Sequence, residues 1–258
     1  MATSSAPVHN WILEPAHRCV VYLTEEAKLG GILQRALTAL SNQRGLLEMV
    51  RRTFTRNRKP LQAINGLLAE QPGLEQWAAE VIATDYSHIN AHGVIGLWVA
   101  IETAVEDTVV AVLMRDAEWE GRARLAGVKV PEALPLLEDD ARRFYRNRLE
   151  RSAPRGSTIS QVFEHVLSVV DVNIAFPDEL RPRLAQLNYI RNCLLHRGGI
   201  VDSRAAEEAP SLGIAVGQPI RVTREMFLRN FDAASGFTSA LFTAVLTSRH
   251  TKVARVES

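Results

Sequence analysis

The chain has 258 residues, of which 47% are hydrophobic and 23% are charged. Thirty Lys and Arg residues against 29 Asp and Glu residues leave a formal net charge of +1. This balance excludes polyanion binding over the whole surface, as in histones, but not a local basic patch. The composition is that of an ordinary globular chain, long enough for one large core or two modest ones.

Cysteine usage and hydropathy point to a reducing compartment. Cys19 and Cys193 lie far apart, without a CxxC pair or a nearby histidine at metal-ligand spacing, so neither a disulfide framework nor a zinc site is expected. The first residues lack a basic segment followed by an apolar run, so no secretory signal is expected. The longest apolar stretch, 93–114, contains three carboxylates and predicts a buried helix rather than a membrane span. We expect a cytoplasmic protein with no cofactor.

Residues 1-87 are predicted to form a mostly helical N-terminal extension. Proline and glycine divide this region into short elements. In chain order they are two runs that favour β-structure, 11–13 and 19–23, which Pro15 separates, and then helices over 25–54, 61–70 and 74–84.

Residues 88-250 are predicted to form an all-α helical bundle, followed by a short tail, 251-258. Thr158 and Gln161 have the spacing of a capping box, and Gly198 with Gly199 is typical of a left-handed helix end. The predicted elements are helices over 88–119, 131-151, 159–170 and 178–197, a polar loop over 202–217, a short strand over 219–222, and a last helix capped by Thr223.

The helix over 178–197 ends in the pattern R-N-x-x-x-H, formed by Arg191, Asn192 and His196. Arg-Asn occurs four times in the chain, but a histidine follows at this spacing only here, and about 0.03 such matches are expected by chance. At 100° per residue, Asn192 and His196 lie roughly 40° apart on one helix face, whereas Arg191 lies roughly 140° from His196. Asn192 and His196 are therefore expected to share a cavity wall.

Arg191 falls in the middle of an apolar arc, where a guanidinium needs a partner. Glu102 lies at the centre of an apolar stripe on the 88–119 helix, and an ion pair between Glu102 and Arg191 is predicted. Such a pair either supports a site or only fixes the register of two helices. His196, likewise, is either a proton carrier or a helix C-cap residue without chemistry.

These residues resemble the HEPN superfamily, whose α-helical bundles carry an R-x4-6-H motif, often as R-N-x-x-x-H, at the end of the third core helix. Arg191, Asn192 and His196 match the motif in order and spacing, and Glu102 matches an acidic residue on the first core helix. The resemblance extends over the helix order from about 88 to 250. It does not cover the N-terminal region, and the charged segment 131-151 looks like an insertion.

The resemblance implies a metal-independent endoribonuclease, in which a ribose 2′-hydroxyl attacks the adjacent phosphate and leaves 2′,3′-cyclic phosphate and 5′-hydroxyl ends. His196 would act as general base or acid, Arg191 would stabilise the phosphorane charge or orient the site, and Asn192 would hold His196 or the phosphate. It also implies a homodimer, which supplies a second histidine. Members serve in toxin–antitoxin or antiviral defence systems, some with a separate antitoxin, while others are catalytically silent modules that bind nucleic acid, a nucleotide or a partner protein.

Two basic clusters are candidates for contact with the RNA backbone. One lacks nearby acids and is, together with Arg197, the expected RNA-binding set: Arg51, Arg52, Arg56, Arg58 and Lys59. The other, within 142–155, is explained equally well as a solvated helix face that neighbouring carboxylates balance. His88 and His92 are expected to cap or face solvent rather than bind metal, and Cys193 to pack at a dimer face rather than react.

Overall fold

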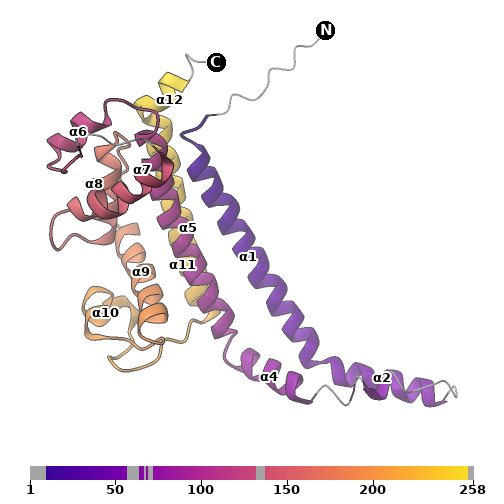
Figure 1. Ribbon diagram of the computed structural model, residues 1–258. Helices are drawn as coiled ribbons and strands as arrows, with labels where there is room; N and C mark the ends of the chain where they lie inside the picture. Colours follow the sequence, from indigo (N-terminus) through magenta and orange to yellow (C-terminus); the bar gives the residue numbers. More distant parts are fainter. Residues whose placement is uncertain (1–9, 57–63, 67, 69–71, 132–136, 255–258) are drawn as a thin grey trace, which may run out of the picture.

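The computed structural model describes residues 10–56, 64–66, 68, 72–131 and 137–254, and within them the chain is all-α (Figure 1). One isolated antiparallel bridge joins Ile200 to Pro219, but the described residues form no strand, so the strand predicted over 219–222 is wrong. No helix among the described residues combines the length and apolar character needed to cross a bilayer.

Helix α1, Glu14–Ser41, begins earlier than predicted and includes residues 19–23. The β-structure predicted there is wrong because Pro15 stands in the first helical turn, where its missing N–H and fixed φ favour a helix start. The predicted helix over 25–54 is in fact two. Asn42 separates α1 from α2, Gln43–Arg56, and its side-chain Nδ2 donates to the Thr38 carbonyl at 2.8 Å.

Helix α4, Pro72–Ala83, agrees closely with its prediction, whereas the predicted helix over 61–70 lies mostly outside the described residues. Helix α5, Ser87–Leu113, ends six residues before the predicted end. Asp116 accepts a hydrogen bond from the Glu118 N–H at 3.0 Å, so its side chain forms a turn before helix α6, Trp119–Leu125.

The charged segment 131-151 is less regular than the single helix predicted for it. Helix α7, Glu138–Phe144, continues into a π-helical turn, Tyr145–Leu149, and a 3₁₀ turn, Glu150–Ser152. Arginines of this segment pair with carboxylates on α5, as described below, and π turns are frequent at functional positions.

Two start and stop signals in the second half are confirmed. The capping box of Thr158 and Gln161 begins helix α8, Ile159–Val169. Helix α9, Leu180–His196, ends at Gly198 and Gly199, whose φ angles of 59° and 79° are left-handed. The remaining elements are α10, Ser203–Glu208, a 3₁₀ turn, Pro210–Leu212, α11, Arg224–Thr247, which the Thr223 side chain caps, and α12, Arg249–Ala254.

Helix α5 is the central element, and it contacts α1, α7, α8, α9 and α11 (Figure 1). Its Leu97, Trp98 and Ile101 are fully buried. The main core is continuous with the first half of α1, since Ala16 and Leu23 belong to the same cluster of buried side chains. Helix α9, whose end carries the motif, packs against both α5 and α11.

Candidate active site at the end of helix α9

The backbone around His196 is fixed from both directions. The Cys193 carbonyl accepts from the N–H of Arg197 at 3.1 Å and of Gly199 at 2.9 Å, so the chain after the helix folds back onto its last turn. The returning chain closes on the same point, because the Ile220 N–H donates to the Gly199 carbonyl at 2.7 Å. His196 thus stands exposed on a rigid helix end.

A cavity of about 340 Å³ opens at this helix end. Asn192 and His196 both line it, as their angular spacing predicts. Arg197, with 63% of its side chain exposed, stands at the same cavity with its Nε 3.4 Å from an Asp202 carboxylate oxygen. The complete lining is Tyr189, Asn192, Cys193, His196, Arg197, Asp202 and Arg204.

Three of these lining residues escaped the sequence analysis. Tyr189 precedes Asn192 by three residues and His196 by seven, a spacing that places all three on one helix face and could have identified it. Asp202 comes from the loop after α9 and Arg204 from α10, and no local periodicity predicts where the chain returns after a loop.

Arg191 is not among the residues that line this cavity. Its Nη2 donates to Glu102 Oε2 at 3.1 Å, which confirms the predicted ion pair, and its Nη1 donates to Asn192 Oδ1 at 2.8 Å. Asn192 in turn donates through Nδ2 to Asn188 Oδ1 at 3.2 Å. A chain of contacts therefore runs from α5 through Arg191 to Asn192 and fixes the orientation of the Asn192 amide.

One turn further along α5, Glu106 and Asp107 hold the charged segment in place. Arg146 Nη2 lies 2.9 Å from Glu106, and Arg142 lies 2.8 Å from Asp107 and 3.3 Å from Glu106. Both carboxylates are buried, and pairing compensates the cost of removing them from water. At least two arginines of the second basic cluster thus serve to dock this segment on α5.

Tyr145, in the π turn, is buried near Glu106 and two further carboxylates. Burial raises the pKa of its hydroxyl, and the nearby carboxylates of Glu150, Glu106 and Glu102 raise this pKa further. The hydroxyl therefore stays protonated. The π turn thus brings a neutral hydroxyl close to Glu102, the partner of Arg191.

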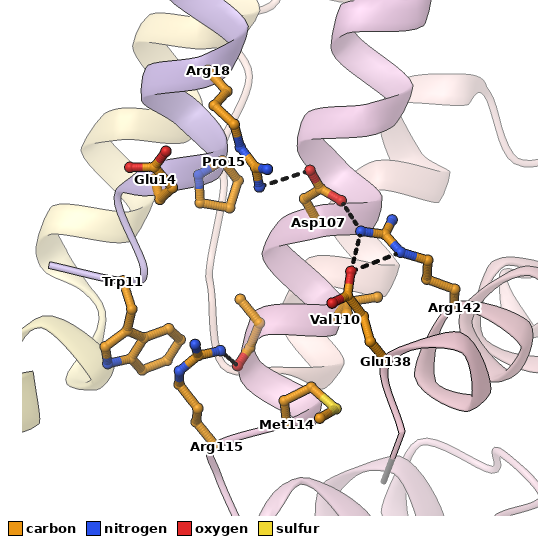
Figure 2. A pocket seen from close by; sticks show the side chains of 11 residues that line it. Trp11, Glu14, Pro15, Arg18, Asp107, Val110, Met114, Arg115, Glu138 and Arg142 are labelled. Carbon is orange, nitrogen blue, oxygen red and sulfur yellow. Dashed lines mark hydrogen bonds and ion pairs between the residues drawn. The ribbon is translucent and has the colours of Figure 1, made fainter. Parts of the chain in front are cut away.

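Figure 2 shows a second cavity, of about 510 Å³, at the joint between α1, α5 and α7. Asp107 stands between Arg18 and Arg142, and Arg142 also reaches Glu138 at 2.8 Å. Across the cavity the Arg115 guanidinium lies 5.1 Å from the ring centre of Trp11. Because cations and carboxylates alternate here, this cavity carries no concentrated charge of either sign.

The first basic cluster lies apart from the motif. Arg51, Arg52 and Arg56 are exposed on α2, whereas Arg58 and Lys59 lie outside the described residues. Helix α2 contacts α1, and Figure 1 shows it projecting away from the bundle and well separated from α9. One chain therefore does not bring α2 and His196 onto one continuous surface.

The remaining candidates have structural surroundings. Cys193 is a buried free thiol whose pKa burial raises, and Cys19 is also buried, with its Sγ 3.4 Å from Thr238 Oγ1. His88 and His92 are exposed on α5. Among the described residues, no three His, Cys, Asp or Glu side chains lie together so as to hold a metal ion.

Comparisons with protein-family models, with curated proteins and with solved structures give no match for this chain. The HEPN resemblance therefore rests on the motif of Arg191, Asn192 and His196 and on the order of the helices.

Proposed function

We propose that the chain is a metal-independent endoribonuclease of the HEPN type. The observation that supports it is the pairing of Asn192 and His196 on the wall of one open cavity, with Arg197 and Arg204 beside them. An exposed imidazole, an oriented amide and adjacent guanidinium groups are the chemistry that binds a phosphodiester and moves protons around it.

In the proposed reaction, His196 takes the proton from a ribose 2′-hydroxyl as its oxygen attacks the adjacent phosphorus. The bond to the 5′-oxygen breaks, and a second acid protonates this leaving oxygen, which gives a 2′,3′-cyclic phosphate and a 5′-hydroxyl. Asn192 and Arg197 would contact the phosphate oxygens. Arg191 acts as a positioning residue, because it holds the Asn192 amide from behind while Glu102 holds its guanidinium.

The second histidine would come from a second copy of the chain. One motif supplies one histidine, whereas the reaction needs a base and an acid, so the functional unit of this proposal is a homodimer. The exposed arginines of α2, with Arg58 and Lys59, would contact the RNA backbone outside the cleavage site. A toxin or antiviral defence role, with a separate antitoxin or defence partner, is the biological setting that the resemblance suggests.

The test is cleavage of end-labelled single-stranded RNA and total tRNA, with and without EDTA. Wild type is compared with His196→Ala and with His88→Ala, a matched loss of an exposed histidine on α5. We expect wild type and His88→Ala to give cyclic-phosphate ends and His196→Ala to lose at least about 10²-fold in rate. Cleavage that His196→Ala retains would overturn the assignment of this histidine, and cleavage that EDTA abolishes would overturn metal independence.

A catalytically silent HEPN module is the alternative, and one observation favours it. The Arg191 guanidinium is engaged by Glu102 and Asn192 instead of lining the cavity, so it forms no part of the cavity wall that a phosphate would meet. In this reading the cavity binds nucleic acid, a nucleotide or a partner protein without reaction. Two results together would support it: none of the three proteins cleaves RNA, and RNA is retained in a gel shift that His196→Ala leaves unchanged.

A further inference from the structure

A hollow of about 410 Å³ lies where α1 packs against α5 and α11. Its size is within the range of small-molecule sites, and most of its lining is apolar.

Two adjacent glycines of α1, Gly30 and Gly31, line this hollow, and no close helix contact requires them. A Cβ added to Gly30 or Gly31 would meet no other atom within 4 Å. By contrast, a Cβ at Gly93 would lie 2.6 Å from the Phe227 ring, and one at Gly96 would lie 2.8 Å from the Glu26 carboxyl carbon. Each glycine inside a helix costs stability relative to alanine. Helix α1 therefore carries this cost at two positions where the only visible result is open space.

The mouth of the hollow is apolar. Leu29, Leu33 and Leu228 are 51%, 40% and 49% exposed, and the partly buried rings of Phe227 and Phe231 form the wall behind them. Aliphatic and aromatic side chains that line a concave surface favour an apolar ligand, because its burial removes apolar area from water on both sides.

The two ends of the hollow carry side chains of opposite charge. At one end Gln34 donates to the buried Asn90 Oδ1 at 3.4 Å and accepts from Arg224 Nη1 at 3.4 Å. Both contacts are at the long limit of a hydrogen bond, so the exposed Arg224 guanidinium can turn towards an incoming acceptor. At the other end stands the Glu26 carboxylate, against Gly96. An anionic group is therefore favoured beside Arg224 and disfavoured beside Glu26.

We infer that this hollow binds a small amphipathic carboxylate. The apolar chain or ring lies over Gly30 and Gly31 against Phe227 and Phe231, and the carboxylate pairs with Arg224. This inference is independent of the ribonuclease proposal, since none of the hollow's lining residues lies on α9.

The test uses decanoate as probe, with decanol and decylamine of the same chain length, titrated into the full-length protein by calorimetry. We expect decanoate to bind more tightly than either analogue. Arg224→Gln should weaken decanoate by about tenfold, which is the effect expected for loss of a charge-assisted hydrogen bond, and should leave decanol unchanged. Equal binding of decylamine and decanoate would overturn the assignment of the anionic end.

Variants that fill the hollow test whether decanoate binds there or at another apolar surface. Gly30→Leu should abolish decanoate binding, and Gly30→Ala should weaken it while raising the melting temperature, because an alanine fits the helix better than glycine. Gly45→Leu is the matched control, since Gly45 lies on α2 and also has open space around it. Unchanged decanoate binding in both Gly30 variants would overturn the site. A second result would also overturn the site: wild type is a dimer, Gly30→Leu is a monomer, and decanoate binds neither protein. A second copy of the chain would then be what covers the hollow.

Discussion

Arg191 donates to Glu102 on α5 and to Asn192 on its own helix, and its buried Nε has no hydrogen-bond partner among the residues that the structure describes. Its side chain is 21% exposed and that of Glu102 is 41% exposed, so water screens their attraction only in part. Replacing one partner leaves the other without its counter-charge, and the two losses should not add.

A double-mutant cycle of Glu102→Gln and Arg191→Met should therefore give a coupling energy of about 1 kcal/mol. Urea unfolding of the four proteins measures it. The control is the cycle of Asp140→Asn and Arg143→Met, a pair within α7 whose Arg143 is 72% exposed, which should give less than about 0.5 kcal/mol. Equal couplings for the two cycles would show that the ion pair between α5 and α9 has no special weight.

At the residue scale, an ion pair can be predicted from the sequence where each charged residue has no other partner on its own apolar face. Glu102 and Arg191 each fall inside an apolar stripe, so each needs the other, and this contact is confirmed. Asn188 is an ordinary polar residue one turn before Asn192, and no pattern indicates that it accepts from the Asn192 amide. The role of His196 stays a prediction.

At the element scale, Asp116 joins three helices. It stands between α5 and α6, pairs with Arg122, accepts from the Glu118 N–H, and lies 2.6 Å from Arg249 of α12. Burial alone would raise the pKa of the Asp116 carboxyl, but the hydrogen bonds from Arg122, Glu118 and Arg249 outweigh it and hold this pKa below its usual value of 3.8.

This junction should make stability fall in acid. Because the folded pKa of Asp116 is lowered, its contribution is fully present above pH 3.8 and is lost as the pH falls through the folded pKa. Asp116→Asn should cost about 2 kcal/mol of unfolding free energy at pH 7, and the difference from wild type should shrink below pH 3.8.

The measurement is urea unfolding of wild type and Asp116→Asn at about four pH values between pH 2.5 and pH 7. Asp139→Asn is the control, because Asp139 is exposed in the first turn of α7 and should show less than about 1 kcal/mol at either pH. A pH-independent cost for Asp116→Asn would mean that its hydrogen bonds, and not its charge, hold the junction.

Helix ends were predictable where the signal is local. The capping box at Thr158, the glycines after α9 and the cap at Thr223 are short-range patterns, and all three are confirmed. The end of α5 is different, because Asp116 is held by Arg249, 133 residues later in the chain. The π turn beginning at Tyr145 depends equally on contacts with α5 that no periodicity contains.

At the scale of the whole molecule, α1 is part of the bundle core. Leu23 of α1 is 4% exposed and belongs to the same buried cluster as Trp98 of α5. A sequence boundary near residue 87 therefore crosses a continuous core. We expect the chain to unfold in one transition that includes α1.

Leu23→Ala should lower the unfolding free energy by about 2–4 kcal/mol while the transition stays single. Thermal unfolding followed by circular dichroism, with hydrogen exchange of amides in α1 and α5, would show both helices losing protection together. Leu46→Ala on α2 is the control, since Leu46 is 61% exposed and should change little. If exchange quickened in α1 alone, residues 1-87 would be a unit that unfolds independently.

Backbone hydrogen bonds join the two ends of the loop between His196 and α11. The Val201 N–H donates to the Gln218 carbonyl at 3.0 Å, and the Gly217 N–H donates back to the Val201 carbonyl at 2.8 Å. Since the two ends are already joined, each doubling of the length between them costs only about 0.6 kcal/mol of closure entropy. The tip near Gly213 should therefore accept an insertion at little cost in stability, and a fluorescent domain could be inserted there without displacing His196.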